Sequence, residues 1–307
     1  MIDILLAVYN SEKYLAQQLD SIFSQTYTNW RILIVDDYSS DKTCNIIEKY
    51  KQKYPEKIVL YKNSRNVGNP ALNFFKLLKM STSEYAMFCD HDDVWLCDKI
   101  ELTLIAMKQK ESQNPDLPIL VHTDLKVVDR NLNVLAESMI LAQKLNPNAK
   151  TLKQLVVQNN VTGCAAMLNR KLVLMAASVP KGAVIHDWWV ALTASAFGAI
   201  EFVNRPTILY RQHGANQVGF KNASKISYVF NRFLNKHEIK SSVLKTYIQC
   251  RSFLNRYRKI LSPDQKKLLE SYLQVGHGNK LQRVSKLVYG GFLKHGFFRK
   301  LGQIIYI

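Results

Sequence analysis

The stretch Tyr85-Ala-Met-Phe-Cys-Asp-His-Asp-Asp-Val-Trp95 is an apolar run that ends abruptly in a cluster of acids. Such a run is typical of a strand buried on both faces, and ligands of open α/β sheets bind at the carboxyl ends of these strands. Neighbouring carboxylates repel one another and raise each other's pKa, so holding all three ionised calls for a divalent cation. The stretch therefore predicts a site for Mg²⁺ or Mn²⁺, with Asp92 as ligand and Asp90 beside it.

A polar loop is the alternative interpretation of the same acids. Asp93 stands where it could cap a helix that begins near Trp95, since aspartate is a favoured N-cap residue. A single cap accounts for one aspartate and leaves two without a role. We therefore favour the metal site.

Three similar units precede this stretch, each an apolar run, a polar loop and a helical pattern. The predicted strands are 1–7, 30–35 and 58–61, and the predicted helices begin near Tyr14, Thr43 and Pro70. A fourth helix is expected from Trp95 to Lys110. This alternation predicts a parallel sheet with helices on both faces.

The rhythm changes after residue 110. We expect short strands at 119–121 and 126–128, a glycine-containing strand at 161–168, a helix after Val184 that ends near Phe197, and a last strand at 208–210. Glycine in a strand marks a place where a ligand can approach the backbone closely, which draws attention to Gly163.

Composition excludes several classes of protein. The 307 residues are 47% hydrophobic, enough for a large core, yet no run of about 18 uncharged apolar residues occurs and no signal-peptide pattern opens the chain. Five cysteines without a Cys-x-x-Cys pair favour reduced thiols over disulfides or a zinc knuckle. We expect a cytoplasmic protein.

The net charge of +18 is concentrated at one end. Residues 223–307 hold 17 lysines and arginines against three acids, so about fourteen of the excess charges lie in this tail. The pattern predicts a near-neutral domain over 1–220 and a basic α-helical region over 221–307. Because apolar residues are interleaved with the charges, we expect this region to dock on an anionic membrane surface.

Two common phosphate-binding motifs are missing from the sequence. It contains neither Gly-x-Gly-x-x-Gly nor Gly-x-x-x-x-Gly-Lys-Ser/Thr, so no glycine-rich backbone loop is available to hold phosphates. If phosphates bind, a metal ion must neutralise much of their charge.

Several short motifs together resemble a known family. They are Ala7-Val-Tyr-Asn10, Asp36-Asp-Tyr-Ser39, Asn66-Val-Gly68 with Asn73, Asp90-His-Asp-Asp-Val-Trp95, Thr123-Asp124, Thr162-Gly163, His186-Asp-Trp188 and Tyr210-Arg-Gln-His213 with Asn216. Over about residues 1–220 the set resembles the inverting glycosyltransferases of family 2, and within them the bacterial rhamnosyltransferases of surface polysaccharide synthesis. The resemblance implies the GT-A fold, a Rossmann-like α/β architecture.

The resemblance also implies a reaction and roles for single residues. The expected reaction transfers L-rhamnose from dTDP-rhamnose to a lipid-linked saccharide at the inner face of the cell membrane. The family pattern departs at Tyr38, where glycine is more frequent, and at His91, where glutamine is. The implied donor-site residues are Ala7, Tyr9, Asn10, Asp37, Asn66, Gly68, Asn73, Asp90 and Arg211, and the implied metal ligands are Asp92, Asp90 and His213.

The chemistry of such a transfer agrees with one further acid. Displacement at an anomeric carbon needs a base for the acceptor hydroxyl and stabilisation of the departing diphosphate. Asp187 fits the base, because the tryptophans after it could form an apolar acceptor shelf; its alternative role is to cap the helix through Phe197. The residues expected to contact the acceptor are Trp95, Thr162, Gly163 and Trp188, although both tryptophans are equally compatible with the core.

Parts of the sequence are compatible with three other functions. A family 2 enzyme that uses a UDP-hexose donor fits the same motifs. Phosphatases of the haloacid dehalogenase type also have Asp-x-Asp-x-Val after a buried strand, but there the strand is the first and a later acid pair completes the site. The basic tail allows nucleic-acid binding, yet it has no recognised reading motif, so we expect no nucleic-acid partner. The sequence leaves a homo-oligomer open.

Overall fold

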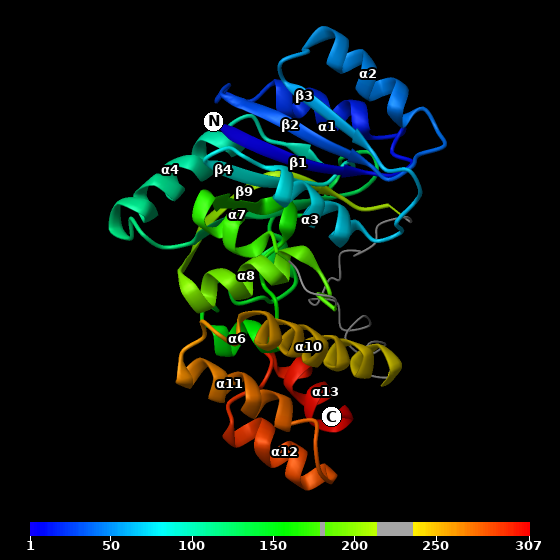
Figure 1. Ribbon diagram of the computed structural model, residues 1–307. Helices are drawn as coiled ribbons and strands as arrows, with labels where there is room; N and C mark the ends of the chain where they lie inside the picture. Colours follow the sequence, from blue (N-terminus) through cyan, green and yellow to red (C-terminus); the bar gives the residue numbers. More distant parts are fainter. Residues whose placement is uncertain (179–181, 214–235) are drawn as a thin grey trace. The chain divides into compact units, whose positions relative to one another are not determined.

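The computed structural model describes residues 1–178, 182–213 and 236–307 (Figure 1). The chain divides into two compact units. Unit 1 consists of Met1–Met139, Val161–Ser178 and Phe197–Phe220, and unit 2 of Ile140–Asn160, Val179–Ala196 and Lys221–Ile307. Two internal segments thus group with the C-terminal helices. The functional division into 1–220 and 221–307 stays a prediction, and Asn216 and residues 221–235 lie outside the described part of the chain.

Unit 1 is built on a mixed sheet with strand order β3-β2-β1-β4-β8-β6-β9-β5, and β7 pairs with β6. The first four strands are parallel, as the alternating pattern predicts, whereas β8 runs antiparallel to both of its neighbours. The strands are β1 Ile2–Val8, β2 Trp30–Asp36, β3 Ile58–Lys62, β4 Tyr85–Cys89, β5 Val94–Trp95, β6 Ile119–Val128, β7 Val134–Ala136, β8 Ala166–Asn169 and β9 Ala199–Arg211.

The helices of unit 1 follow the predicted order. They are α1 Leu15–Phe23, α2 Thr43–Lys53, α3 Pro70–Met80, α4 Lys99–Gln113 and α7 Arg170–Ala176, with a 3₁₀ turn at Gly163–Ala165. Pro70 opens α3 and the Asn69 side chain caps it by accepting from the Ala71 amide. Every residue of β4 is buried although its side chains alternate between the faces, so both faces of this strand are covered.

The glycine-containing strand expected at 161–168 is a 3₁₀ turn at Gly163–Ala165 followed by β8. Two further expectations about elements were wrong. The helix expected from Trp95 begins at Lys99, because Val94 and Trp95 pair with β9 as a short strand. The two strands expected around Thr123 are one continuous strand, β6. In both places the pairing partner is β9, which lies far away in the sequence and leaves no local signal.

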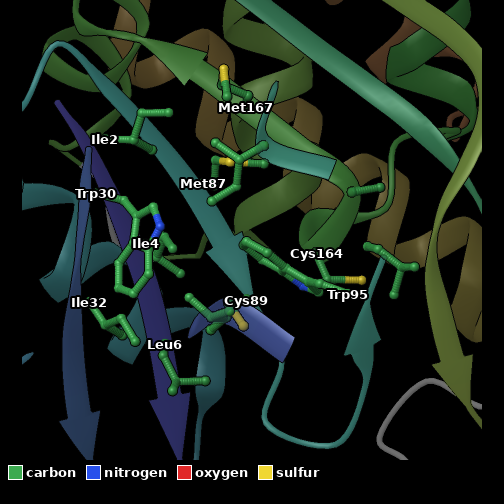
Figure 2. Packing of buried hydrophobic residues seen from close by; sticks show 14 of the residues in the cluster. Ile2, Ile4, Leu6, Trp30, Ile32, Met87, Cys89, Trp95, Cys164 and Met167 are labelled. Atoms are coloured by element: carbon green, nitrogen blue, oxygen red, sulfur yellow. The ribbon is translucent and has the colours of Figure 1, made fainter. Parts of the chain in front are cut away.

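The core of unit 1 lies along β1, β2 and β4 (Figure 2). Ile4, Met87 and Met167 are fully buried, and Trp95 and Cys164 pack in the same cluster. Truncating a buried side chain of this size to alanine costs about 2–5 kcal/mol, since a cavity replaces close packing. This rigid core fixes the positions of the strand ends, and the polar loops begin at these ends.

The strand register brings the carboxyl ends of the parallel strands to one edge. Val8 pairs with Asp36, Asp36 with Lys62, and Leu6 with Cys89. The loops after β1, β2, β3 and β4 therefore begin at nearly the same level. The polar residues predicted to bind the donor follow at this edge.

Unit 2 is helical, which confirms the predicted class of the C-terminal region. Its helices are α5 Met139–Ala142, α6 Leu152–Val157, α8 His186–Phe197, α10 Lys236–Tyr257, α11 Pro263–Gln274, α12 Lys280–Tyr289 and α13 Phe297–Tyr306. Capping boxes begin α6, α11 and α12. Trp189 packs against Phe253 and Tyr257, with ring centroids 5.6 and 5.7 Å apart, and ties α8 to α10. No helix in the described ranges combines the length and apolarity that crossing a bilayer requires.

Buried His186 makes unit 2 sensitive to acid. Burial lowers the pKa of His186 from 6.5 to about 3, so the folded state resists a proton that the unfolded state accepts. Stability should therefore fall by up to about 1.4 kcal/mol per pH unit as the pH drops from about 6.5 toward about 3. Urea unfolding at several pH values should show a shallower loss for His186→Leu than for the wild type. The His237→Leu variant, altered at an exposed position of α10, should keep the wild-type slope; equal slopes for all three proteins would contradict this role.

Candidate nucleotide-sugar and metal site

The loop after β1 is tied to the loop after β2. The Asn10 side-chain oxygen accepts from the Ser40 amide at 2.9 Å, and the Asn10 amide donates to Ser39 Oγ at 2.9 Å. Tyr9, between Asn10 and the end of β1, is 49% exposed. The two loops thus form one polar surface at the carboxyl edge of the sheet. Ala7 lies next to this surface, in the second-last residue pair between β1 and β2.

Asp37 organises the loop before α3. Its Oδ1 accepts from Asn63 Nδ2 at 2.7 Å and from the Val67 amide at 2.9 Å, and its Oδ2 accepts from the Gly68 amide at 3.1 Å. Gly68 has φ +64°, a conformation that favours glycine. Asn63 Nδ2 also donates to Asn73 at 3.0 Å.

The structure therefore brings Asp37, Gly68 and Asn73 together, as the motif set implies. Asn66 is an exposed member of the same loop. Direct contact of these residues with a nucleotide stays a prediction.

Tyr38 adopts a conformation that is costly for a side chain with a Cβ. Its φ is +68°, and 61% of its surface is exposed. This explains in physical terms why glycine suits the position. The left-handed conformation costs a non-glycine residue about 1–2 kcal/mol.

We expect Tyr38→Gly to have a larger free energy of unfolding than Tyr38→Ala, by about 1 kcal/mol, because both lose the ring but only alanine keeps the strain. Urea unfolding of the two variants measures the difference. Equal stabilities would mean that the conformation at this position carries no strain.

The acids after β4 contact the end of β9. Asp92 is 8% exposed, and its Oδ2 lies 2.8 Å from His213 Nε2. The Asp93 carboxylate is fully buried and accepts from the Arg211 amide at 3.0 Å. The Tyr14 ring stacks on His213 with centroids 5.0 Å apart. The predicted partners Asp92 and His213 are thus in direct contact.

Arg211 has its guanidinium directed toward protein acceptors. Nε donates to the Asp92 carbonyl oxygen at 2.7 Å, Nη1 to the Arg130 carbonyl oxygen at 2.9 Å, and Nη2 to Gln17 Oε1. The group also lies 4.5 Å from the Tyr14 ring centroid, and Arg211 is 2% exposed. These contacts favour a positioning role for Arg211, which holds the acid loop in place. They do not favour the direct contact with the donor that the resemblance implies.

A second set of ligand atoms lies beside the first. The ligand atoms of Asp90, Asp93 and Cys164 all fall within 4.8 Å of one another. Burial, with the charges of Asp92 and Asp90, raises the pKa of Asp93 well above its usual value. Burial likewise raises the pKa of the Cys164 thiol, which disfavours the thiolate that binds metals.

The oxygen atoms of the aspartates are therefore the better ligands, and they suit Mg²⁺ or Mn²⁺. The residues present fit such an ion. Sequence reasoning counted Asp93 in the acid cluster, with a helix cap as the alternative, but did not assign it as a ligand. It missed Cys164, Tyr14 and Gln17. Only Cys164 had a nearby signal, the predicted ligand approach at Gly163.

The residues expected to contact the acceptor separate into two groups. Trp95 is 2% exposed and lies in the core, with Lys99 Nζ 4.7 Å from its ring centroid. Trp188 is 7% exposed, and its indole N–H donates to the Leu155 carbonyl oxygen at 2.6 Å. Both rings therefore serve packing rather than an acceptor shelf. For Thr162 and Gly163, at the start of the 3₁₀ turn, acceptor contact stays a prediction.

Asp187 lies in the first turn of α8, in unit 2. Its Oδ1 accepts from Asn159 Nδ2 at 3.2 Å and from the Trp188 amide. An acid in the first turn of a helix is stabilised by the helix dipole. These contacts are therefore compatible with the alternative role of Asp187, which is to stabilise the start of α8. The acids after β4 belong to unit 1.

Comparison with known proteins gives the class of the fold and then the family. Two solved structures align with nearly the whole chain: TarS residues 1–349 of S. aureus with UDP-GlcNAc (TM-score 0.53, 18% identity, 94% of this chain and 80% of that one) and the mannosyltransferase PcManGT of Pyrobaculum calidifontis with GDP-Man and Mn²⁺ (TM-score 0.54, 14% identity, 99% and 84%). The fold is GT-A, as the resemblance implies. The model of "Glycosyl transferase family 2" matches residues 3–173, and the chain belongs to this family.

Two curated relatives are similar over much of the chain. The dTDP-rhamnosyl transferase RfbG of Shigella flexneri is 28% identical over 236 residues, which cover 73% of this chain and 76% of that protein. The UDP-Glc:alpha-D-GlcNAc-diphosphoundecaprenol beta-1,3-glucosyltransferase WfgD of Escherichia coli is 23% identical over 180 residues, or 59% and 64%. The family match makes the protein a glycosyltransferase.

Proposed function

We propose that this glycosyltransferase transfers L-rhamnose from dTDP-rhamnose to a lipid-linked saccharide, with inversion at the anomeric carbon. The acid cluster Asp90–Asp93 at the carboxyl end of β4, with His213 against Asp92, is the observation that carries the proposal. The similarity to a dTDP-rhamnosyl transferase supports the donor, and the similarity to a glucosyltransferase named for a diphosphoundecaprenol acceptor supports the lipid link.

The acid cluster would hold the divalent ion. Asp92 and Asp90 are the proposed ligands, with His213 as the third, and the ion would neutralise charge on the diphosphate as it leaves. Arg211 holds the acid loop to β9 through the Asp92 carbonyl oxygen. Asp37 shapes the loop on which the nucleotide is proposed to lie.

Asp187 is the proposed base. Its carboxylate would take the proton of the acceptor hydroxyl as that oxygen attacks the anomeric carbon. The Asn159 side-chain amide, which donates to Asp187 Oδ1, would hold the carboxylate in place. Inversion follows from a single displacement at this carbon.

A donor screen tests the proposal. Release of nucleoside diphosphate should be measured from dTDP-rhamnose, UDP-glucose and UDP-GlcNAc, each with Mn²⁺ and with a chelator. We expect the highest kcat/KM for dTDP-rhamnose and its loss with chelator. Preference for a UDP-hexose would contradict the proposed donor but not the membership of family 2. Turnover that is unaffected by the chelator would contradict the proposed metal dependence.

We also propose that unit 2 docks on the inner face of the cell membrane. Leu281, Tyr289 and Phe297, on α12 and α13, expose 81%, 90% and 72% of their surfaces, and the two helices carry Arg283, Lys286, Arg299 and Lys300. Exposed apolar side chains beside basic ones are typical of helices that lie in a membrane interface. A homo-oligomer is a further prediction without a surface assigned to it.

Point variants test this docking better than truncation, because residues 236–307 form one compact unit with two earlier segments. The double variant Tyr289→Ser/Phe297→Ser should bind vesicles with 30% phosphatidylglycerol at least tenfold more weakly, as each buried aromatic ring contributes about 1.5–3 kcal/mol. Co-sedimentation measures binding, and 0.5 M NaCl should weaken it further. The control Leu72→Ser removes a half-exposed apolar residue from unit 1. If the double variant sediments like this control, these helices do not dock.

A further inference from the structure

Unit 2 contains a cavity of about 530 Å³ that the proposed sugar transfer does not use. It lies among residues of α10, α12 and α13 and of the turn at Gly276. A volume of this size accommodates a small organic ligand. Lys236, Lys240 and Lys280 on its lining are exposed, so the cavity is accessible from solvent.

The polar lining of the cavity is strongly basic. Lys236, Lys240, Lys280 and Arg283 contribute four positive charges, and no aspartate or glutamate side chain lies among the described residues of the lining. Arg283 Nε donates to the Gly278 carbonyl oxygen at 2.7 Å, and Lys280 Nζ donates to the Ile305 carbonyl oxygen. Two of the cations are thus anchored by backbone groups and not by acids. Four like charges around one space repel one another, and an anion relieves that repulsion.

A buried hydroxyl adds a hydrogen-bond donor to this lining. Tyr247 Oη is buried and has no hydrogen-bond partner among the described residues. Burial raises the pKa of Tyr247 to about 12, so the hydroxyl keeps its proton. A buried polar group without a partner is unfavourable, and a ligand oxygen that accepts from it removes that cost.

The remaining wall of the cavity is apolar. Val243, Leu244 and Ile305 line it, and Leu244 and Ile305 are 58% and 40% exposed. A free inorganic anion would use only the basic part of this lining. A neutral lipid would use only the apolar part.

We propose that this cavity binds an amphiphile that carries a phosphate monoester on an apolar chain. The phosphate lies among Lys236, Lys240, Lys280 and Arg283 and accepts from the Tyr247 hydroxyl, while the chain lies along Leu244 and Ile305. A phosphate presents several acceptor oxygens and two negative charges, which match this set of donors. The site differs from general attraction to an anionic surface because it is defined, saturable and selective for the headgroup.

Calorimetric titration of the full chain tests the site. The probes are dihexanoyl phosphatidic acid and farnesyl phosphate, below their micelle concentrations, with inorganic phosphate and dihexanoyl phosphatidylcholine for comparison. We expect one saturable site that binds at least one of the two phosphate monoesters at least tenfold more tightly than either comparison ligand. Whichever of the two binds more tightly identifies the chain as acyl or isoprenoid.

Matched variants separate the cavity from the charge of the surface. Lys240→Gln/Arg283→Gln should weaken binding at least tenfold, whereas Lys259→Gln/Lys267→Gln removes two positive charges outside the cavity lining and should change it less than twofold. Tyr247→Phe should weaken binding about threefold without lowering the urea midpoint, because it deletes a hydroxyl that has no partner among the described residues.

Equal effects of the two double variants, or titrations without saturation, would overturn the proposal. None of these titrations needs a sugar donor. A failed donor screen therefore does not contradict ligand binding in the cavity, and a failed titration does not contradict the proposed sugar transfer.

Discussion

Asp92→Asn should reduce metal-dependent donor turnover at least about 100-fold while the protein stays folded. The change keeps the size of the side chain and leaves an oxygen that can contact His213. In the wild-type protein, His213 Nε2 lies 2.8 Å from Asp92 Oδ2. It removes the negative charge that an ion would need most, in a position only 8% exposed where water compensates little. Nucleoside diphosphate release at increasing Mn²⁺ concentrations measures turnover, and calorimetry measures Mn²⁺ binding without turnover.

A companion variant distinguishes the two sets of ligand atoms at this site. If Asp92, Asp90 and His213 hold the ion, Asp92→Asn loses Mn²⁺ affinity and Asp93→Asn retains most of it. The order reverses if Asp90 and Asp93 hold the ion beside Cys164. Asp116→Asn, at an acid whose side chain is 94% exposed in unit 1, is the control for loss of a charge. Wild-type turnover and affinity in Asp92→Asn would remove this residue from the metal site.

Asp187→Asn should slow sugar transfer by roughly 10²- to 10⁴-fold without weakening dTDP binding. An amide cannot take the proton of the acceptor hydroxyl. Its oxygen can still accept from Asn159 Nδ2 and the Trp188 amide, so the first turn of α8 keeps its contacts. Single-turnover transfer to a synthetic acceptor and calorimetry with dTDP measure the two quantities separately.

Asp264→Asn provides a matched control for this experiment. Asp264 is also an acid in the first turn of a helix of unit 2, α11, so its loss has the same effect on a helix dipole. We expect it to leave transfer unchanged. A near-normal rate in Asp187→Asn contradicts the base, and a joint collapse of rate and dTDP affinity would assign Asp187 to the donor or metal site instead.

Local patterns in the sequence were enough to predict the first half of unit 1. Its apolar runs, spaced by helical patterns, predicted four parallel strands, and the register places their polar ends at one edge. Asp37 directly follows β2, whereas Gly68 lies in the loop after the neighbouring strand β3 and Asn73 in the first turns of α3. The three come together because β2 and β3 are parallel neighbours and the Asp37 carboxylate accepts from this loop. The helical class of the C-terminal region could be predicted in the same way, from apolar residues recurring among basic ones.

Contacts between distant residues decided the rest. Val94 and Trp95 are a strand because β9 pairs with them, and Asp93 accepts from the amide of Arg211, 118 residues away. Trp95 and Trp188 face the interior, which the sequence left open.

Periodicity and capping signals are local in the chain and report only whether a segment is a helix or a strand. Which distant backbone group satisfies a buried carboxylate depends on the packing of the whole unit. For this protein the sequence alone determined the family, the polar edge and its acids. The tertiary structure decided that Arg211 holds the acid loop, that Cys164 stands beside it, and that four basic residues of the tail surround one cavity.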